Sequence, residues 1–308
     1  MSGGRVRVLL ALVLVALLVA LGAPRHHEVT ITLVGDVMLG RGVADAIMEH
    51  GPHYPFEQVA AELSRGDLLF GNLEAPLTDR GIRIPRVNSL RGEPEMAPAL
   101  AEVGFDAVSL ANNHAIDYGR EGLERTCEVL EAAGVAPVGV GATLAGARAC
   151  RVIEARGVRV GFVAFSNFPE AVFIHDSQRT SICLLSDEAL AAVIPAAARQ
   201  CDVLVASVHW GQEGERWTSD FERATAHRMI DLGADIVVGH HAHVRGEVER
   251  YRGGIIAYGL GNLVFDADSY GGNEGWVLHV RATRDGVSEV EAVPVRVREC
   301  RAVIEQYH

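Results

Sequence analysis

The sequence predicts a layered α/β sandwich, preceded by one hydrophobic segment at the amino terminus. Two observations indicate this fold. After residue 28, short β-branched or aliphatic runs alternate with amphipathic stretches, which is typical of parallel strands joined by crossover helices. From about residue 247, consecutive strand-like runs are separated by Gly- and Asp-containing turns. This change of pattern predicts a second, mixed or antiparallel sheet.

The elements follow from these patterns in order. Five apolar runs predict buried strands: 29–34, 67–71, 106–110, 202–208 and 235–239. Two amphipathic segments, each ending at a glycine, predict helices: 120–133 and 219–232. The last part of the chain predicts three further strands: 254–258, 275–282 and 287–297.

Residues 8–23 are unbroken apolar sequence behind Arg5 and Arg7. This length is allowed both for a membrane anchor and for a cleavable signal peptide, and we favour the anchor. The two arginines predict that the short amino-terminal end stays inside and that the chain after residue 28 lies outside the cytoplasm. We therefore expect a single-pass protein of the cell membrane, or a secreted one if the segment is cleaved. Residues 29–308 contain no linker or repeat, which predicts a single domain.

Composition narrows the classes of function. The 308 residues are 49% hydrophobic and 22% charged, which is globular composition. A net charge of −12 argues against a nucleic-acid partner bound through bulk charge. All 28 basic residues are arginine, which excludes P-loop, protein-kinase and Schiff-base chemistry because each needs a lysine amine. The five cysteines include no CxxC pair, which excludes zinc ribbons and thioredoxin-like motifs.

Metal-ligand residue types follow all five buried runs. They are Asp36, Glu74, Asn113 with His114, His209, and the pair His241 and His243. Because ligands bind at the carboxyl ends of parallel strands, we expect these side chains to meet at one edge. Two carboxylates, an amide oxygen and several imidazoles suit Mn, Fe or Zn, and contain too many nitrogens for Ca or Mg alone. The sequence therefore predicts one or two divalent metal ions.

The His-x-His spacing adds a geometric expectation. On an extended chain, residues two apart share a face. We therefore expect His241 and His243 to converge on the metal centre, and His240 to point away from it.

Several neighbouring residues have two interpretations. Asp117 either accepts the ring proton of His114 or caps the helix that begins near residue 120. Arg41 and Arg91 lie close to strand-end motifs and are candidates to bind an anionic substrate, although an arginine is more often a solvated surface residue. Asn262 either contacts the site or forms a Gly-Asn turn.

Six ordered motifs resemble the bacterial CapA family of poly-γ-glutamate capsule synthesis proteins. They are GDVMLGR (35–41), GNLEAPL (71–77), SLANNHAIDYG (109–119), VHWGQE (208–213), GADIVVGHHAHV (233–244) and YGLGNLVFD (258–266). The resemblance covers roughly residues 29–268 and implies a calcineurin-like fold, which is an α/β/β/α sandwich of the metallophosphatase type.

The resemblance also implies roles for the candidate residues. Asp36 and His243 would bind one metal, Asn113, His209 and His241 would bind another, and Glu74 would bridge the two. His114 would face the leaving group or the transition-state charge; in an enzyme it would be the catalytic acid, with Asp117 as the candidate that orients it.

Two residues depart from the common metallophosphoesterase pattern. Met38 stands where an Asp-x-His motif supplies a histidine, and Glu74 replaces the usual bridging aspartate. A thioether is a poor ligand for a hard divalent ion, so the first metal position lacks one ligand.

Two hypotheses follow for function. In the first, the chain is an extracytoplasmic metal-dependent hydrolase acting on a phosphoester or on a bond of an anionic polymer. In the second, it is a non-enzymatic component of a capsule synthesis and export complex, whose metal centre is structural or binds polymer carboxylates beside other capsule synthesis proteins. Met38 favours the second hypothesis, and the Asn113-His114 pair favours the first.

Overall fold

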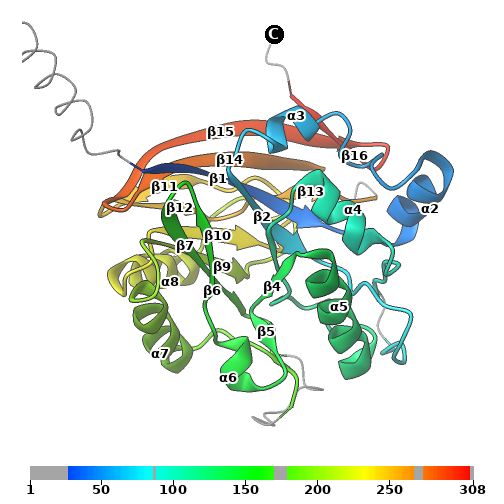
Figure 1. Cartoon of the computed structure of the whole chain (residues 1–308), viewed down its shortest axis with the longest axis horizontal. Coiled ribbons are helices and arrows are strands. Elements are labelled where there is room, and N and C mark those ends of the chain that lie inside the picture. Colours follow the sequence, from blue (N-terminus) through cyan, green and yellow to red (C-terminus); the bar gives the residue numbers. More distant parts are fainter. Residues whose placement is uncertain (1–26, 86–87, 170–178, 267–272, 306–308) are drawn as a thin grey trace, which may run out of the picture.

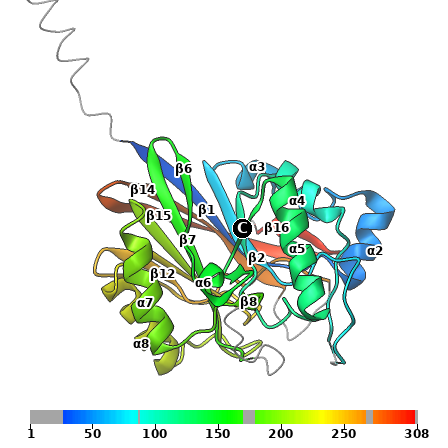
Figure 2. The same cartoon turned by 60° about the horizontal axis from the view of Figure 1, so that its bottom comes forward.

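The computed structural model describes residues 27–85, 88–169, 179–266 and 273–305. The predicted anchor at 8–23 lies outside these ranges. Within them, no helix has both the length and the apolar character needed to cross a membrane. Two β-sheets lie against each other, with helices on the outer side of each (Figures 1 and 2).

The first sheet contains parallel and antiparallel strands in the order β16-β15-β14-β1-β2-β3-β4, and β13 pairs with the end of β1. Its strands are β1 (Glu28–Val37), β2 (Leu68–Leu73), β3 (Ala107–Ser109), β4 (Ala136–Val138), β13 (Asn262–Val264), β14 (Glu274–Thr283), β15 (Gly286–Arg298) and β16 (Arg301–Ile304). Strands β1 to β4 are parallel, and β14 pairs with β1 in the antiparallel direction.

The second sheet has the order β11-β12-β10-β9-β7-β6. Its strands are β6 (Arg151–Ala155), β7 (Val158–Ser166), β9 (Val203–His209), β10 (Ile236–His240), β11 (Val248–Tyr251) and β12 (Gly254–Ala257). The four inner strands are parallel, and an antiparallel hairpin closes each edge. Two short strands pair separately: β5 (Val140–Gly141) and β8 (Ser181–Ile182).

Three apolar clusters hold four layers together. One cluster fills the space between the sheets and includes Phe70 of β2, stacked on Phe162 of β7. The others join each sheet to its helices. The first sheet is covered by α2 (Arg41–His50), α3 (Ala60–Leu63), α4 (Met96–Val103) and α5 (Gly119–Ala133), and the second by α6 (Leu144–Ala147), α7 (Asp187–Ala198) and α8 (Asp220–Asp231). Figure 2 shows α4 and α5 on one side and α7 and α8 on the other. The predicted α/β/β/α sandwich is confirmed.

The two predicted helices form where the sequence places their ends. Ser219 and Glu222 make a reciprocal capping box at the start of α8, which satisfies backbone N–H groups that the helix leaves unpaired. At the other helix, α5, the chain leaves through Gly134 in a left-handed conformation with φ of 86°.

The prediction for the last part of the chain was wrong in its topology. Strand β12 extends the second sheet in the parallel direction, whereas β14 and β15 join the first sheet. The reason is that β14 buries both of its faces, with Val277 against the helices and Leu278 between the sheets. A strand buried on both faces belongs inside a large sheet. The β6–β7 hairpin and the strands β4, β5, β8, β11, β13 and β16 were not predicted.

Candidate metal centre

The candidate residues come from two sheet edges rather than from one, which corrects the sequence-based expectation. Strands β1, β2 and β3 of the first sheet and β9 and β10 of the second sheet end at the same place. Strand register aligns the residues within each sheet. Asp36 stands between Asn72 of β2 and Asn262 of β13, and His209 of β9 stands beside His240 of β10.

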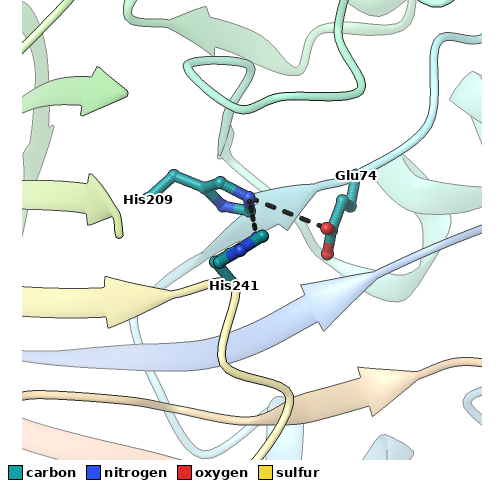
Figure 3. Close-up of side chains that lie close together, drawn as sticks. All are labelled: Glu74, His209 and His241. Carbon is teal, nitrogen blue, oxygen red and sulfur yellow. Dashed lines mark hydrogen bonds and ion pairs between the residues drawn. The ribbon is translucent and has the colours of Figure 1, made fainter. Parts of the chain in front are cut away.

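Glu74 is shared by two groups of possible metal ligands. One group is Glu74, His209 and His241, whose side chains point toward one another (Figure 3), and the other is Asp36, Glu74 and His243. Within each group the ligand atoms lie within 4.8 Å of one another. Glu74 Oε1 is 3.7 Å from His209 Nε2 and 3.8 Å from His243 Nε2.

The Glu74 carboxylate is the strongest sign that these groups fit a cation. It is completely buried, and neither oxygen has a hydrogen-bond partner among the described residues. Burying a polar group without a partner costs about 1–3 kcal/mol, and more for a charged group. Burial and the neighbouring Asp36 carboxylate together hold the pKa of Glu74 well above its usual value. A divalent ion between Glu74 and its imidazole neighbours would remove this cost.

In the group of Glu74, His209 and His241, both imidazoles offer neutral nitrogen ligands. His209 Nε2 lies 3.1 Å from His241 Nδ1 and 2.8 Å from Asn113 Oδ1. Burial and the proximity of His241 keep the pKa of His209 well below its usual value, and burial and His243 lower the pKa of His241 to about 3. Both rings are therefore unprotonated near neutral pH, which is the state that binds metal.

The group of Asp36, Glu74 and His243 compensates charge differently. Burial raises the pKa of Asp36, but the His240 and His243 rings, whose Nδ1 atoms lie 3.2 Å and 3.3 Å from its oxygens, outweigh burial and hold the pKa well below the usual value. Burial alone lowers the pKa of His243, yet the Glu74 and Asp36 carboxylates raise it to about 10. The positive charge of protonated His243 therefore compensates the Glu74 and Asp36 carboxylates, as a metal ion would. Both the donor set and this charge pattern fit a divalent ion.

The argument from the extended His-x-His segment was wrong, because the chain turns where β10 ends. His241 and His243 both have positive φ, at 90° and 58°. Their ring centroids lie 6.0 Å apart, and the two rings belong to different ligand groups, as the family resemblance implies. His240 does not point away from the centre, since its Nδ1 lies 3.2 Å from Asp36 Oδ1.

Two asparagines that the sequence analysis missed hold the centre in place. Asn72 donates a hydrogen bond to Asp36 Oδ1 at 2.9 Å. Asn112 donates to Asn72 Oδ1 at 3.1 Å and accepts from the backbone N–H of His114 at 3.0 Å. Their positions beside Glu74 and Asn113 in the same motifs were the available signal.

His114 is held by Asp117 and not by a metal-ligand group. Its Nδ1 lies 2.7 Å from Asp117 Oδ2, and Asp117 also accepts the backbone N–H of Leu90 at 2.7 Å. Helix α5 begins with Tyr118 as its N-cap and without a side-chain cap. Of the two interpretations of Asp117, the geometry therefore agrees with orientation of an imidazole. The His114 side chain is 12% exposed, so its ring can be reached from outside.

The three predicted substrate-binding residues lie in different settings. Asn262 is buried at the centre, with Oδ1 2.9 Å from His243 Nδ1. The Arg41 guanidinium is paired with Asp266 and lies over the Phe265 ring. Arg91 is paired with Glu93 at 2.6 Å and lies over the Tyr118 ring. The structure brings Asn262 into the centre and holds both arginines in surface ion pairs.

Two further residues near the candidate ligands are Met38, which lies two positions after Asp36, and Phe168. Met38 is completely buried in the core between the first sheet and its helices, where its sulfur accepts the backbone N–H of Gly40 at 3.1 Å. The Phe168 ring lies 4.2 Å from the His241 ring and 5.7 Å from the His209 ring, between centroids. No sequence signal pointed to Phe168.

The protein has a metallophosphoesterase-like fold, and its strand ends carry two candidate metal-binding groups. The fold is similar to that of the 5′-nucleotidase precursor from Thermus thermophilus, with a TM-score of 0.52 and 12% identity, over 90% of this chain and 54% of that one. This likeness concerns the fold alone.

The sequence comparisons identify the family. Residues 30–267 match the family described as bacterial capsule synthesis protein PGA_cap, and the chain belongs to this family. It is 31% identical over 297 residues to the capsule biosynthesis protein CapA of Bacillus anthracis, covering 91% of this chain and 71% of that protein. It is 29% identical over 271 residues to the PGA biosynthesis protein CapA of Bacillus subtilis (strain 168), and the match covers 87% of this chain and 71% of that protein.

Proposed function

We propose that this protein is a divalent-metal-dependent hydrolase of capsule polymer biosynthesis, acting on a phosphoester or on a bond of a poly-γ-glutamate chain. The family and its named relatives support the capsule process. The observation that carries the hydrolase proposal is the buried Glu74 carboxylate, shared by two ligand groups and free of any hydrogen bond from the described residues.

The residues divide into two metal positions. Asp36 and His243 would hold one ion, Asn113, His209 and His241 would hold the other, and Glu74 would contact both. Ions of this kind supply Lewis-acid stabilisation of developing negative charge and make water acidic enough to react near neutral pH.

The proton needed by the leaving group is assigned to His114. Asp117 fixes the ring through Nδ1, so Nε2 is the atom that exchanges a proton with substrate. Phe168 covers the rings of His209 and His241, which keeps water away from that side of the ligand group and strengthens its electrostatic interactions.

Replacing His114 by Gln is expected to lower turnover about 10²–10⁴-fold, the usual contribution of general acid–base catalysis. Asp117→Asn is expected to lower it less, since the ring remains but loses its fixed tautomer. Metal content per chain should stay unchanged in both variants, because neither residue belongs to a ligand group. The measurement is hydrolysis of a generic phosphodiester and of poly-γ-glutamate by the metal-loaded full chain. No turnover of either compound by the wild-type protein would count against the hydrolase.

The second candidate function is a non-enzymatic component of a capsule synthesis and export complex. Met38 favours it, since the position that holds a histidine in the common Asp-x-His pattern is here a completely buried thioether, which supplies no ligand on the Asp36 side. In this role the centre would bind carboxylates of the polymer. Metal-dependent binding of poly-γ-glutamate without shortening of the chain would support it over the hydrolase.

We propose that the protein acts outside the cytoplasm and is anchored in the cell membrane through residues 8–23. The support is the apolar run behind Arg5 and Arg7. Fractionation of cells is expected to place the full-length chain in the membrane, with a folded part accessible to external protease. A full-length cytosolic pool alone would reject this location.

A further inference from the structure

Two cysteines lie together on the second sheet, away from the metal-ligand groups. Cys150 directly precedes β6, and Cys201 lies between α7 and β9. Both pack against the core between this sheet and helices α7 and α8. A Cβ atom added to Gly161 of β7 would meet the Cys150 sulfur at 2.8 Å and the Cys201 sulfur at 2.7 Å. The two sulfur atoms therefore share the space that this glycine leaves open.

We propose that Cys150 and Cys201 form a reversible disulfide when the protein meets a small-molecule disulfide. Both are free thiols in the structure. A disulfide needs its two sulfur atoms to approach through side-chain rotation without backbone movement, and two sulfur atoms that both lie within 2.8 Å of one point have a short distance to cover. Disulfides persist in oxidising compartments, which agrees with the proposed location outside the cytoplasm. The inference is independent of the metal centre.

The two thiols have different roles in the exchange. Cys150 is only partly buried, and the neighbouring Cys201 thiol lowers the pKa of the Cys150 thiol. The proximity of Cys150, together with burial, raises the pKa of the Cys201 thiol. Since the thiolate is the nucleophile, Cys150 reacts first and Cys201 second.

The exchange proceeds in two balanced steps. The Cys150 thiolate attacks one sulfur of the small disulfide, which forms a mixed disulfide and releases one small thiolate. That thiolate takes the proton of Cys201, and the Cys201 sulfur then attacks the Cys150 sulfur, releasing a second small thiolate that takes a proton from water. Two protein thiols and one small disulfide thus give one protein disulfide and two small thiols.

The bridge would connect an edge strand to the interior of the molecule. Strand β6 is the last strand of the second sheet and pairs only with β7 within that sheet. A bond from Cys150 to Cys201 would tie it to the connection between α7 and β9. By restricting the unfolded chain, such a bond is expected to raise the thermal midpoint by roughly 5–15 °C.

The test uses the purified full chain in detergent, incubated with oxidised glutathione and then denatured and alkylated. We expect the intact mass to fall by two hydrogen atoms, five reactive thiols to become three, and one linked peptide pair to contain Cys150 and Cys201. Dithiothreitol should reverse all three changes. Cys201→Ser should instead retain one glutathione on Cys150, because the second thiol is missing.

Three variants make the test specific. Cys183→Ser removes another buried thiol of the same core and should still form the bridge. Cys150→Ser should neither lose the two hydrogen atoms nor retain glutathione on Cys201. Gly161→Ala should slow bridge formation, since its Cβ fills the space between the sulfurs. Five reactive thiols remaining in the oxidised wild-type protein, or the same mass loss in Cys150→Ser, would overturn the proposal.

Discussion

Glu74→Gln is expected to remove metal from both ligand groups at once, because Glu74 is the one residue common to them. The substitution keeps the size of the side chain and removes its charge. Replacing residues that only support a ligand already costs about 10–100-fold in metal affinity, and the loss of a shared direct ligand is expected to cost at least that much at each position. The measurement is metal content per chain of the purified full-length protein.

A second readout of the same variant is thermal stability. A ligand that binds only the folded state at 100 times its Kd stabilises it by about 2.7 kcal/mol. Added Mn²⁺ or Zn²⁺ should therefore raise the thermal midpoint of the wild-type protein by several degrees, and that of Glu74→Gln hardly at all. An equal rise in both would show that Glu74 does not bind the metal.

Histidine variants provide the matched controls. His209→Ala and His243→Ala should each lose one ion, since each ring belongs to one group. His240→Ala should keep its metal content nearly intact, because His240 contacts Asp36 but belongs to neither group. Equal metal loss from His240→Ala, His241→Ala and His243→Ala would contradict the assignment of ligands.

Met38→His is expected to lower the free energy of unfolding by about 1–3 kcal/mol, the usual cost of burying a polar group without a partner. Met38 is completely buried among apolar side chains. The control is Met38→Leu, which preserves volume and should cost less than about 1.5 kcal/mol. Urea denaturation of the metal-free proteins measures both changes.

The same variant separates the two candidate functions. We expect no gain in metal content, because Met38 faces the core and its sulfur is already bonded to the Gly40 N–H. A gain of one ion would show that the new imidazole reaches the Asp36 side after all. In that case, a variant with two ions and no hydrolysis of phosphoesters or of poly-γ-glutamate would favour the polymer-binding function.

The sequence predicted the strands whose local pattern is unambiguous. The five buried runs correspond to β1, β2, β3, β9 and β10, since uninterrupted β-branched runs have few alternative structures. The sequence also predicted that the polar residues after these strands lie close together. It could not predict that the strands belong to two sheets, because the local pattern does not determine which strands pair over long distances.

The direction of the side chains just after β10 was also predicted wrongly. Alternation holds only while the chain stays extended, and the left-handed conformation of His241 ends it. His240 consequently lies beside Asp36 instead of pointing away from the centre. Asn72 and Asn112 were missed for a related reason, since hydrogen bonds between residues about 40 positions apart leave no local periodicity.

The placement of the candidate centre where two sheets meet also bears on when a metal ion could bind. The candidate ligands extend from Asp36 in β1 to His243 after β10, so they span most of the chain. A chain still emerging from the ribosome, or still crossing a membrane, has no complete set of them. Because such a site exists only in the finished fold, loading of a metal ion would be a late event. An ion bound there would therefore be selected from those available in the compartment where folding ends.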